Sequence, residues 1–149
     1  MSGSARAIRT EGPSEREGRS QVRSVHLRGN DDDQTRELED ARKHLTELVD
    51  FVETNEPRMI AFHAFLDEEG DKLTIVQVHP DSAPMEFHMQ VNAKHFATAF
   101  DFLDAIVSEQ YYGAISDALA TELAKWDDPA VTVTRMPVHE GGFTRTNVR

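Results

Sequence analysis

Periodic patterns of apolar residues divide the chain into strands and helices. Residues 22–27 and 130–136 alternate apolar with polar side chains, which predicts a short strand near each end of the chain. Residues 58–66 and 72–79 predict two more strands, joined by the polar turn DEEGD that contains Gly70. The sequence therefore predicts four strands, two of which form a hairpin.

Helical periodicity occupies the segments between these strands. Apolar residues recur at intervals of three and four between residues 33 and 54, which predicts an amphipathic helix that ends before Pro57. Residues 83–109 predict a long second helix, and residues 114–126 predict an added shorter one. The order is strand, helix, strand, strand, helix with an added helix, strand, which is the βαββαβ order of the ferredoxin-like α+β fold.

A fold of this kind has a four-stranded antiparallel sheet with helices on one face. The predicted strand 58–66 is apolar on both of its own faces. One face carries Met59, Ala61, His63 and Phe65, and the other carries Ile60, Phe62, Ala64 and Leu66. Since helices cover only one side of the sheet, the second apolar face predicts contact with another subunit, and therefore a homodimer.

The composition fits one domain with short tails. The chain has 149 residues, of which 38% are hydrophobic, and it contains no cysteine. Residues 1–20 have almost nothing to bury and predict a disordered tail, residues 21–146 predict a single ferredoxin-like domain, and residues 147–149 form an end tail. No apolar run is long enough for a membrane span or a secretory signal, so we expect a cytoplasmic protein with no membrane partner.

The charge distribution argues against nucleic acid as a partner. The formal net charge is −11, and the excess of acidic residues lies after residue 30, because residues 1–30 hold six arginines and three glutamates. An acidic body repels phosphate backbones, so we expect no nucleic-acid binding by the folded part.

Several short motifs, taken in order, resemble a known family. A helix that ends in Asn-Glu-Pro, a strand that ends in His-Pro-Asp and a helix that carries His88 follow one another in FVETNEPRMIAFHAFLDEEGDKLTIVQVHPDS, MEFHM and KHF. Over residues 50–146, and most clearly over 51–96, the chain resembles the antibiotic-biosynthesis-monooxygenase-like (ABM-like) group of dimeric α/β-barrel proteins. The resemblance implies that two ferredoxin-like sheets pair into a barrel with a small apolar cavity.

The resemblance also carries expectations about activity. Some members of the group oxidise quinol-like or aromatic molecules without metal or flavin, relatives degrade haem, and many have no known activity. For this chain, the resemblance therefore implies a monooxygenase that works without a cofactor and binds a small aromatic molecule. Several members have a tyrosine where Phe62 stands, so a phenolic hydroxyl is missing from this chain.

Histidine is the residue type in this chain that points to chemistry, because a neutral imidazole accepts a proton near pH 7 or ligates a metal. His63 lies within an apolar strand, and the resemblance places His88 toward the cavity, so these two are the candidate catalytic residues. His95 follows seven residues after His88, on the same helix face. The candidate substrate-binding residues are Phe62, Phe65, His79 and His95. Each of these side chains also fits a role in packing alone.

No metal site is predicted from the spacing of possible ligands. If the hairpin pairs Leu66 with Lys72, His63 and His79 lie about 13 Å apart along the ladder, too far to share one ion. A site built from His63, His88 and acidic partners stays open. Three functions also stay open: a cofactor-free oxygenase with a histidine base, a non-catalytic dimer that binds a small molecule or acts as an accessory, and a haem-binding or haem-degrading relative.

Overall fold

The computed structural model describes residues 19–27, 34–99 and 101–145. Five strands and four helices follow one another along the chain. They are β1 (Arg19–Leu27), α1 (Gln34–Asn55), β2 (Ala61–Leu66), β3 (Lys72–His79), α2 (Ser82–Val91), α3 (Ala93–Ala99), β4 (Leu103–Tyr112), α4 (Asp117–Ala124) and β5 (Thr132–Met136). The two predicted tails lie almost entirely outside the described residues, although β1 begins within the range expected to be disordered.

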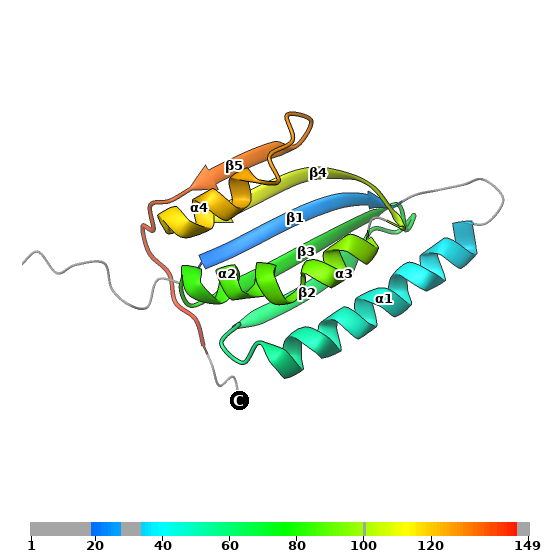
Figure 1. The fold of residues 1–149 in the computed structure, drawn as a ribbon, viewed down its shortest axis with the longest axis horizontal. Coiled ribbons are helices and arrows are strands. Elements are labelled where there is room, and N and C mark those ends of the chain that lie inside the picture. The colour runs from blue at the N-terminus through cyan, green and yellow to red at the C-terminus, as the bar shows by residue number, and fades with distance from the viewer. Residues whose placement is uncertain (1–18, 28–33, 100, 146–149) are drawn as a thin grey trace, which may run out of the picture.

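The strands form one sheet in the order β2-β3-β1-β4-β5, with the helices on one face of it (Figure 1). β1 lies at the centre and pairs antiparallel with both β3 and β4. The predicted ferredoxin-like α+β fold is confirmed. None of the helices in the described part of the chain has the length and apolarity that crossing a bilayer requires.

Two details of the predicted sheet are wrong. The sheet has five strands, and β5 runs parallel to β4, so the predicted strand 130–136 is an addition at the edge and not the fourth strand. The fourth strand is β4, which overlaps the last part of the long helix predicted over 83–109. β4 is rich in β-branched and aromatic residues, and pairing with β1 and β5 on its two sides stabilises it as a strand.

The turn between β2 and β3 sets the register of the hairpin. The Asp67 carboxylate accepts the backbone N–H groups of Asp71 and Lys72 at 2.9 and 3.0 Å, and Gly70 adopts a φ of 75°. Asp67 therefore lies opposite Lys72, and Leu66 pairs with Leu73, one residue away from the register that the sequence analysis assumed. A shift of one residue changes which side chains share a face.

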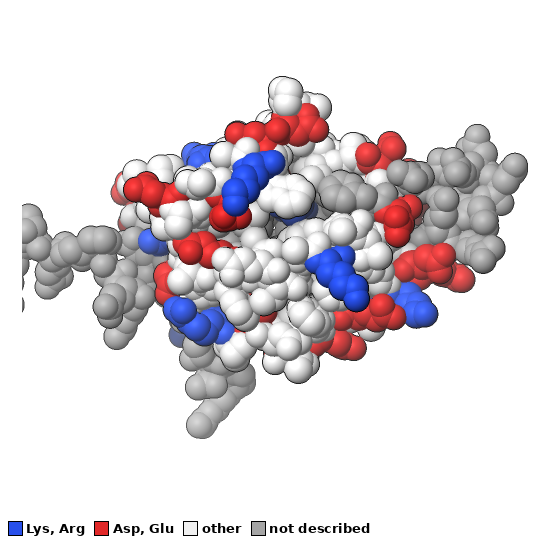
Figure 2. All heavy atoms as spheres, viewed as in Figure 1, with Lys and Arg blue, Asp and Glu red and all other residues white. Residues whose placement is uncertain are grey.

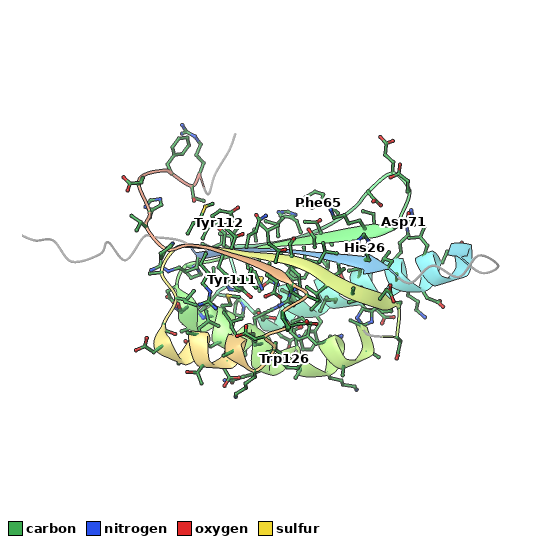
Figure 3. The ribbon with its side chains drawn as sticks, turned by 90° about the horizontal axis from the view of Figure 1, so that it is seen from above. His26, Phe65, Asp71, Tyr111, Tyr112 and Trp126 are labelled. Carbon is green, nitrogen blue, oxygen red and sulfur yellow. The ribbon has the colours of Figure 1, made fainter. Side chains whose placement is uncertain are left out.

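The two faces of the sheet have different surroundings. Beneath α2 and α4 a core cluster joins Met85, Tyr111, Leu119 and Leu123, all buried. On the opposite face no helix of the described chain covers the sheet, and Phe65 and Tyr112 project from it (Figure 3). We call this second side the helix-free face. It also carries Val22, His63, Val76, Val78 and Met136.

Candidate functional site

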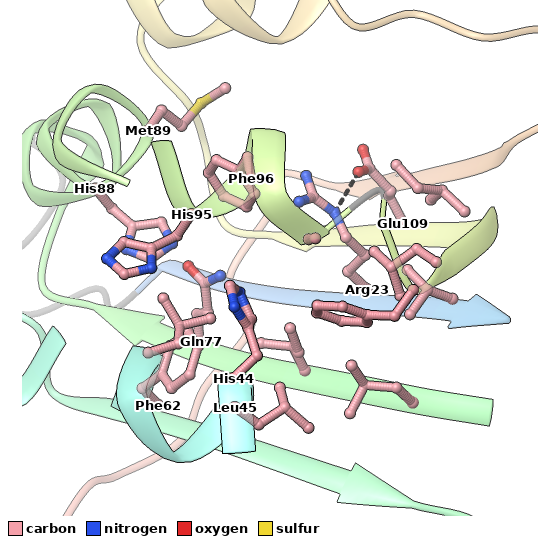
Figure 4. Close-up of a pocket in the computed structure, with 18 of the residues that line it drawn as sticks. Arg23, His44, Leu45, Phe62, Gln77, His88, Met89, His95, Phe96 and Glu109 are labelled. Carbon is pink, nitrogen blue, oxygen red and sulfur yellow. Dashed lines mark hydrogen bonds and ion pairs between the residues drawn. The ribbon is translucent and has the colours of Figure 1, made fainter. Parts of the chain in front are cut away.

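A pocket lies between the sheet and the helices, inside a single chain (Figure 4). Its cavity volume is about 100 Å³. Apolar side chains from both layers form most of its wall, among them Leu45, Phe62, Ile75, Phe96 and Phe102. Seen from the helix side, much of the surface over α2 and α3 is uncharged, with a basic side chain over α3 and both acidic and basic side chains around it (Figure 2). The pocket is therefore suited to a small apolar molecule.

A buried polar cluster of Glu56, His88 and Asn92 adjoins the pocket, and of the three His88 lines it. Glu56 follows the last residue of α1, where its backbone N–H donates to the Val52 carbonyl, and it is 4% exposed. His88, on α2, places Nδ1 2.9 Å from both carboxylate oxygens of Glu56. Asn92 caps the C-terminus of α2, and its side-chain amide donates to Glu56 Oε1 at 2.5 Å and to the His88 carbonyl at 2.9 Å.

This cluster determines which nitrogen of the neutral His88 imidazole carries the hydrogen. The carboxylate of Glu56 accepts the hydrogen on Nδ1 of His88, so in the neutral ring Nε2 carries a lone pair. Nε2 makes no hydrogen bond within the described part of the chain, and His88 lines the pocket. Phe62 and Phe96 flank the ring at centroid distances of 6.0 and 5.9 Å. An imidazole oriented in this way by a buried carboxylate has the chemistry to accept a proton from a molecule in the apolar space.

A second polar network, built from β1 and β4, also adjoins the pocket. The Arg23 guanidinium donates from Nε to Glu109 Oε1 at 2.6 Å, and the Tyr111 hydroxyl donates to Glu109 Oε2 at 2.6 Å. The Gln21 amide donates to the Tyr111 hydroxyl at 3.1 Å. Burial and the neighbouring Glu109 carboxylate raise the pKa of Tyr111. This network keeps Tyr111 protonated and holds the Arg23 guanidinium 5.5 Å from the Phe96 ring.

Two more histidines lie on the pocket wall. His44 of α1 and His95 of α3 meet edge to face with ring centroids 5.9 Å apart. Burial, and then the nearby His95, lowers the pKa of His44. His44 therefore stays neutral at physiological pH and adds a polar edge to the pocket without a positive charge.

Comparison with solved structures places this architecture among known proteins. No protein-family model and no curated protein matches the sequence. A crystal structure of MupZ from Pseudomonas fluorescens superposes with a TM-score of 0.68 at 17% identity, covering 89% of this chain and 98% of that one. A protein of Caulobacter crescentus CB15, described as a "putative antibiotic biosynthesis monooxygenase", superposes with a TM-score of 0.54 at 15% identity, covering 68% of this chain and 93% of that one. The chain has an ABM-like fold.

A further structure with this fold bears on assembly. A protein of Bacteroides fragilis NCTC 9343, described as dimeric, ferredoxin-like and of unknown function, superposes with a TM-score of 0.53 at 10% identity, covering 64% of this chain and 94% of that one. At such identities the likeness establishes the ABM-like fold and leaves activity, substrate and assembly to be argued from this chain's own residues.

Within the ABM-like fold, the candidate site residues predicted from the sequence lie in three different regions. His88, His95 and Phe62 line the pocket together. His63 and Phe65 project from the helix-free face, where both are exposed. His79 is fully buried beneath α2, with its ring 6.1 Å from that of His88, but it does not line the pocket.

The observed hairpin register also revises the relation between His63 and His79. His63 pairs with Val76, so His79 is three positions further along the ladder and its side chain lies on the opposite face of the sheet. His63 and His88 are likewise separated by the sheet, which leaves no shared metal site for them. Among the described residues, no group of three or more histidine, aspartate or glutamate side chains is arranged to hold a metal ion.

Several residues in and beside the pocket could not be predicted from the sequence. Glu56 was recognised there only as part of a helix end, although an acid next to Pro57 at the end of an amphipathic helix is an unusual residue to bury. Asn92 follows His88 by four residues, a spacing that places both on one helix face. Arg23, Gln77 and Glu109 alternate correctly for the helix-covered face, but nothing in the local pattern marked that face as the pocket side.

Proposed function

We propose that this protein is an enzyme that oxygenates a phenolic aromatic molecule with O₂, without metal or flavin, and that His88 is the general base. The observation that carries the proposal is the His88 imidazole, which a buried glutamate holds with Nε2 facing an apolar pocket. A base in such surroundings converts a phenol into an electron-rich phenolate and keeps water away from it.

The proposed reaction balances without an external reductant. His88 Nε2 takes the hydroxyl proton, and Glu56 stabilises the imidazolium that forms. One oxygen atom of O₂ joins the ring carbon opposite the hydroxyl, and the other leaves as water with the hydroxyl hydrogen and the hydrogen of that ring carbon. The substrate supplies all four electrons and becomes a quinone. Phe62 and Phe96, on either side of His88, form walls for a planar ring.

The test is O₂ consumption with 1,5-dihydroxynaphthalene, measured with an oxygen electrode and corrected for the uncatalysed rate. We expect His88→Ala to lower the catalysed rate about 100-fold or more, as loss of a general base does. Glu56→Gln keeps the shape of the side chain but removes the charge that stabilises the imidazolium. We therefore expect this variant to lower the catalysed rate as well. His139→Ala, at an exposed site outside the pocket, is the matched histidine control. Full activity in His88→Ala would exclude His88 as the base.

Other outcomes would assign the pocket differently. Saturable binding of 1,5-dihydroxynaphthalene without O₂ consumption would indicate that the protein is a non-catalytic binding or accessory module. The lack of a phenolic hydroxyl at Phe62 favours that second candidate. A Soret shift on addition of haem, lost in His88→Ala, would instead indicate haem ligation through the free Nε2.

We also propose that the protein forms a homodimer through its helix-free face. Phe65, Met136 and Tyr112 expose large apolar surfaces on that side, whereas surfaces of this kind are normally covered in a folded protein. The pocket lies on the other side of the sheet, and the described residues that line it all come from one chain. Dimerisation therefore supports the scaffold and adds no residue to the reaction that we propose.

A further inference from the structure

Behind the pocket, two polar residues of β3 form a hydrogen bond that the proposed reaction does not use. Gln77 and His79 are two residues apart, so they share the helix-covered face of the strand, and both are buried. Nε2 of His79 lies 3.2 Å from Oε1 of Gln77. Nδ1 of His79 is buried and has no hydrogen-bond partner among the described residues.

The surroundings of His79 determine which nitrogen carries its hydrogen. Burial, and then the nearby His88, lowers the pKa of His79 to about 4, so the ring is neutral at physiological pH and has one N–H group. If that hydrogen were on Nδ1, a buried donor would have no partner, which costs more than a buried acceptor without one. The hydrogen therefore lies on Nε2 and is donated to Gln77 Oε1.

This bond in turn fixes the orientation of the Gln77 amide. With Oε1 engaged by His79, the amide nitrogen is the end of the side chain left for the pocket, which Gln77 lines (Figure 4). That nitrogen makes no hydrogen bond within the described part of the chain. His88 lines the same pocket from the helix layer above. The pocket is thus lined by a hydrogen-bond donor on the sheet side, the Gln77 amide, and by a proton acceptor on the helix side, the His88 imidazole.

We propose that the Gln77 amide donates a hydrogen bond to the anionic oxygen that forms when His88 removes the substrate proton, and that His79 is the positioning residue that orients this donor. The inference rests on the proposed function, because it assumes a substrate whose oxygen becomes an anion in the pocket. It narrows the substrate class to molecules with an acidic hydroxyl on an apolar ring. A donor aimed at developing charge stabilises the ionised form more than the neutral one.

The experiment compares two ligands under nitrogen, so that it does not depend on oxygenation. The probe is 4-nitrophenol, whose phenolate absorbs visible light, and the matched ligand is nitrobenzene, which lacks the hydroxyl. Binding of each is measured in the wild-type chain and in Gln77→Met, which replaces the amide by an apolar side chain of similar size. We expect Gln77→Met to weaken phenolate binding about tenfold, the size of a hydrogen bond to a charged group, and to change nitrobenzene binding less than twofold.

Two variants of His79 separate positioning from simple structural support. His79→Gln keeps an N–H donor close to the position of Nε2, and we expect it to retain most of the phenolate preference. His79→Leu removes the donor, and we expect it to reduce that preference as far as Gln77→Met does. A variant that is merely less well folded lowers the binding of both ligands together, so the ratio of the two affinities reports orientation alone.

The possible results lead to different conclusions. An unchanged ratio in Gln77→Met would overturn the role of Gln77 while leaving His88 as the base. An unchanged ratio in His79→Leu, with a reduced ratio in Gln77→Met, would overturn the positioning role of His79. A wild-type chain that binds neither ligand and consumes no O₂ with 1,5-dihydroxynaphthalene would overturn the proposed function together with this inference.

Discussion

Tyr111 and Tyr112 are neighbours in β4, yet they lie in opposite environments (Figure 3). Tyr111 is 3% exposed, belongs to the core cluster beneath the helices and donates its hydroxyl to Glu109. Tyr112 is 37% exposed on the helix-free face and donates its hydroxyl to Gln110. Each tyrosine bonds the residue two positions before it, on its own face. The two hydrogen bonds have the same local geometry along the strand. They differ because helices cover the face that carries Tyr111, whereas none of the described helices covers the face that carries Tyr112.

The comparison extends to the whole sheet. On the helix-covered face, buried polar groups are held in fixed positions around an apolar pocket. On the helix-free face, polar and apolar side chains mix, and the large apolar side chains of Phe65 and Met136 are exposed. The first face therefore fits the reaction that we propose, and the second fits the association that we propose.

Truncating the two tyrosines gives the largest expected difference between the faces. Tyr111→Ala removes a buried ring and breaks its bonds to Gln21 and Glu109, and we expect a loss of about 3–5 kcal/mol in the free energy of unfolding. Tyr112→Ala removes a partly exposed ring, and we expect a loss of about 1 kcal/mol or less at low protein concentration. Urea unfolding followed by circular dichroism measures both. Equal losses would show that the two faces are equally buried in solution.

The pH dependence of stability gives the next largest effect. His79 has a pKa of about 4 in the folded chain against 6.5 for an ordinary histidine. Between these values the unfolded chain binds a proton that the folded chain does not, so the free energy of unfolding falls as pH drops from about 6.5 to about 4, by at most roughly 3 kcal/mol from this group. Below pH 4 this contribution no longer changes.

A substitution isolates the contribution of His79 to that slope. His79→Gln removes the titrating group, and we expect its unfolding free energy to fall less than that of the wild-type chain between pH 6.5 and pH 4. His63→Gln is the control. It removes an exposed histidine from the helix-free face and shows how the loss of an exposed imidazole changes the unfolding free energy over the same pH range. Parallel curves for the wild-type chain and His79→Gln would contradict the assignment of a buried neutral imidazole at position 79.

The alternation of residues in β2 and β3 was sufficient to predict the hairpin, and the order of strands and helices along the chain predicted the fold class. Phe62 and Phe65 were correctly expected on opposite faces, because the side-chain period of a strand is fixed by its geometry. The identity of β4 was not accessible in the same way. Its segment contains apolar residues at helical as well as strand spacing, and only the long-range pairing with β1 decides between the two.

The candidate site shows the same limit. A histidine on a helix is visible in a sequence, so His88 could be named in advance. Its partner Glu56 lies 32 residues earlier, just after α1, and only the folded chain brings the two side chains together. The side of the sheet that holds the pocket was likewise undetermined, since both faces of β2 are apolar. Deciding it requires knowing where the helices lie, and that placed His63 and Phe65 away from the pocket.

The smallest expected effect concerns association through the helix-free face. Phe65 is 57% exposed there, and Phe65→Glu introduces a charge that a dimer interface would have to bury. We expect the dimer dissociation constant to rise at least tenfold, measured by sedimentation equilibrium, with the pocket and its binding of 4-nitrophenol unchanged. Phe87→Glu, at an exposed phenylalanine of α2 on the helix side, is the matched control and should leave association as it is. Because the described lining of the pocket lies on the other side of the sheet, a monomeric Phe65→Glu protein that retains O₂ consumption would separate the roles of the two faces. Loss of activity together with dimerisation would instead show that the helix-free face supports the reaction site.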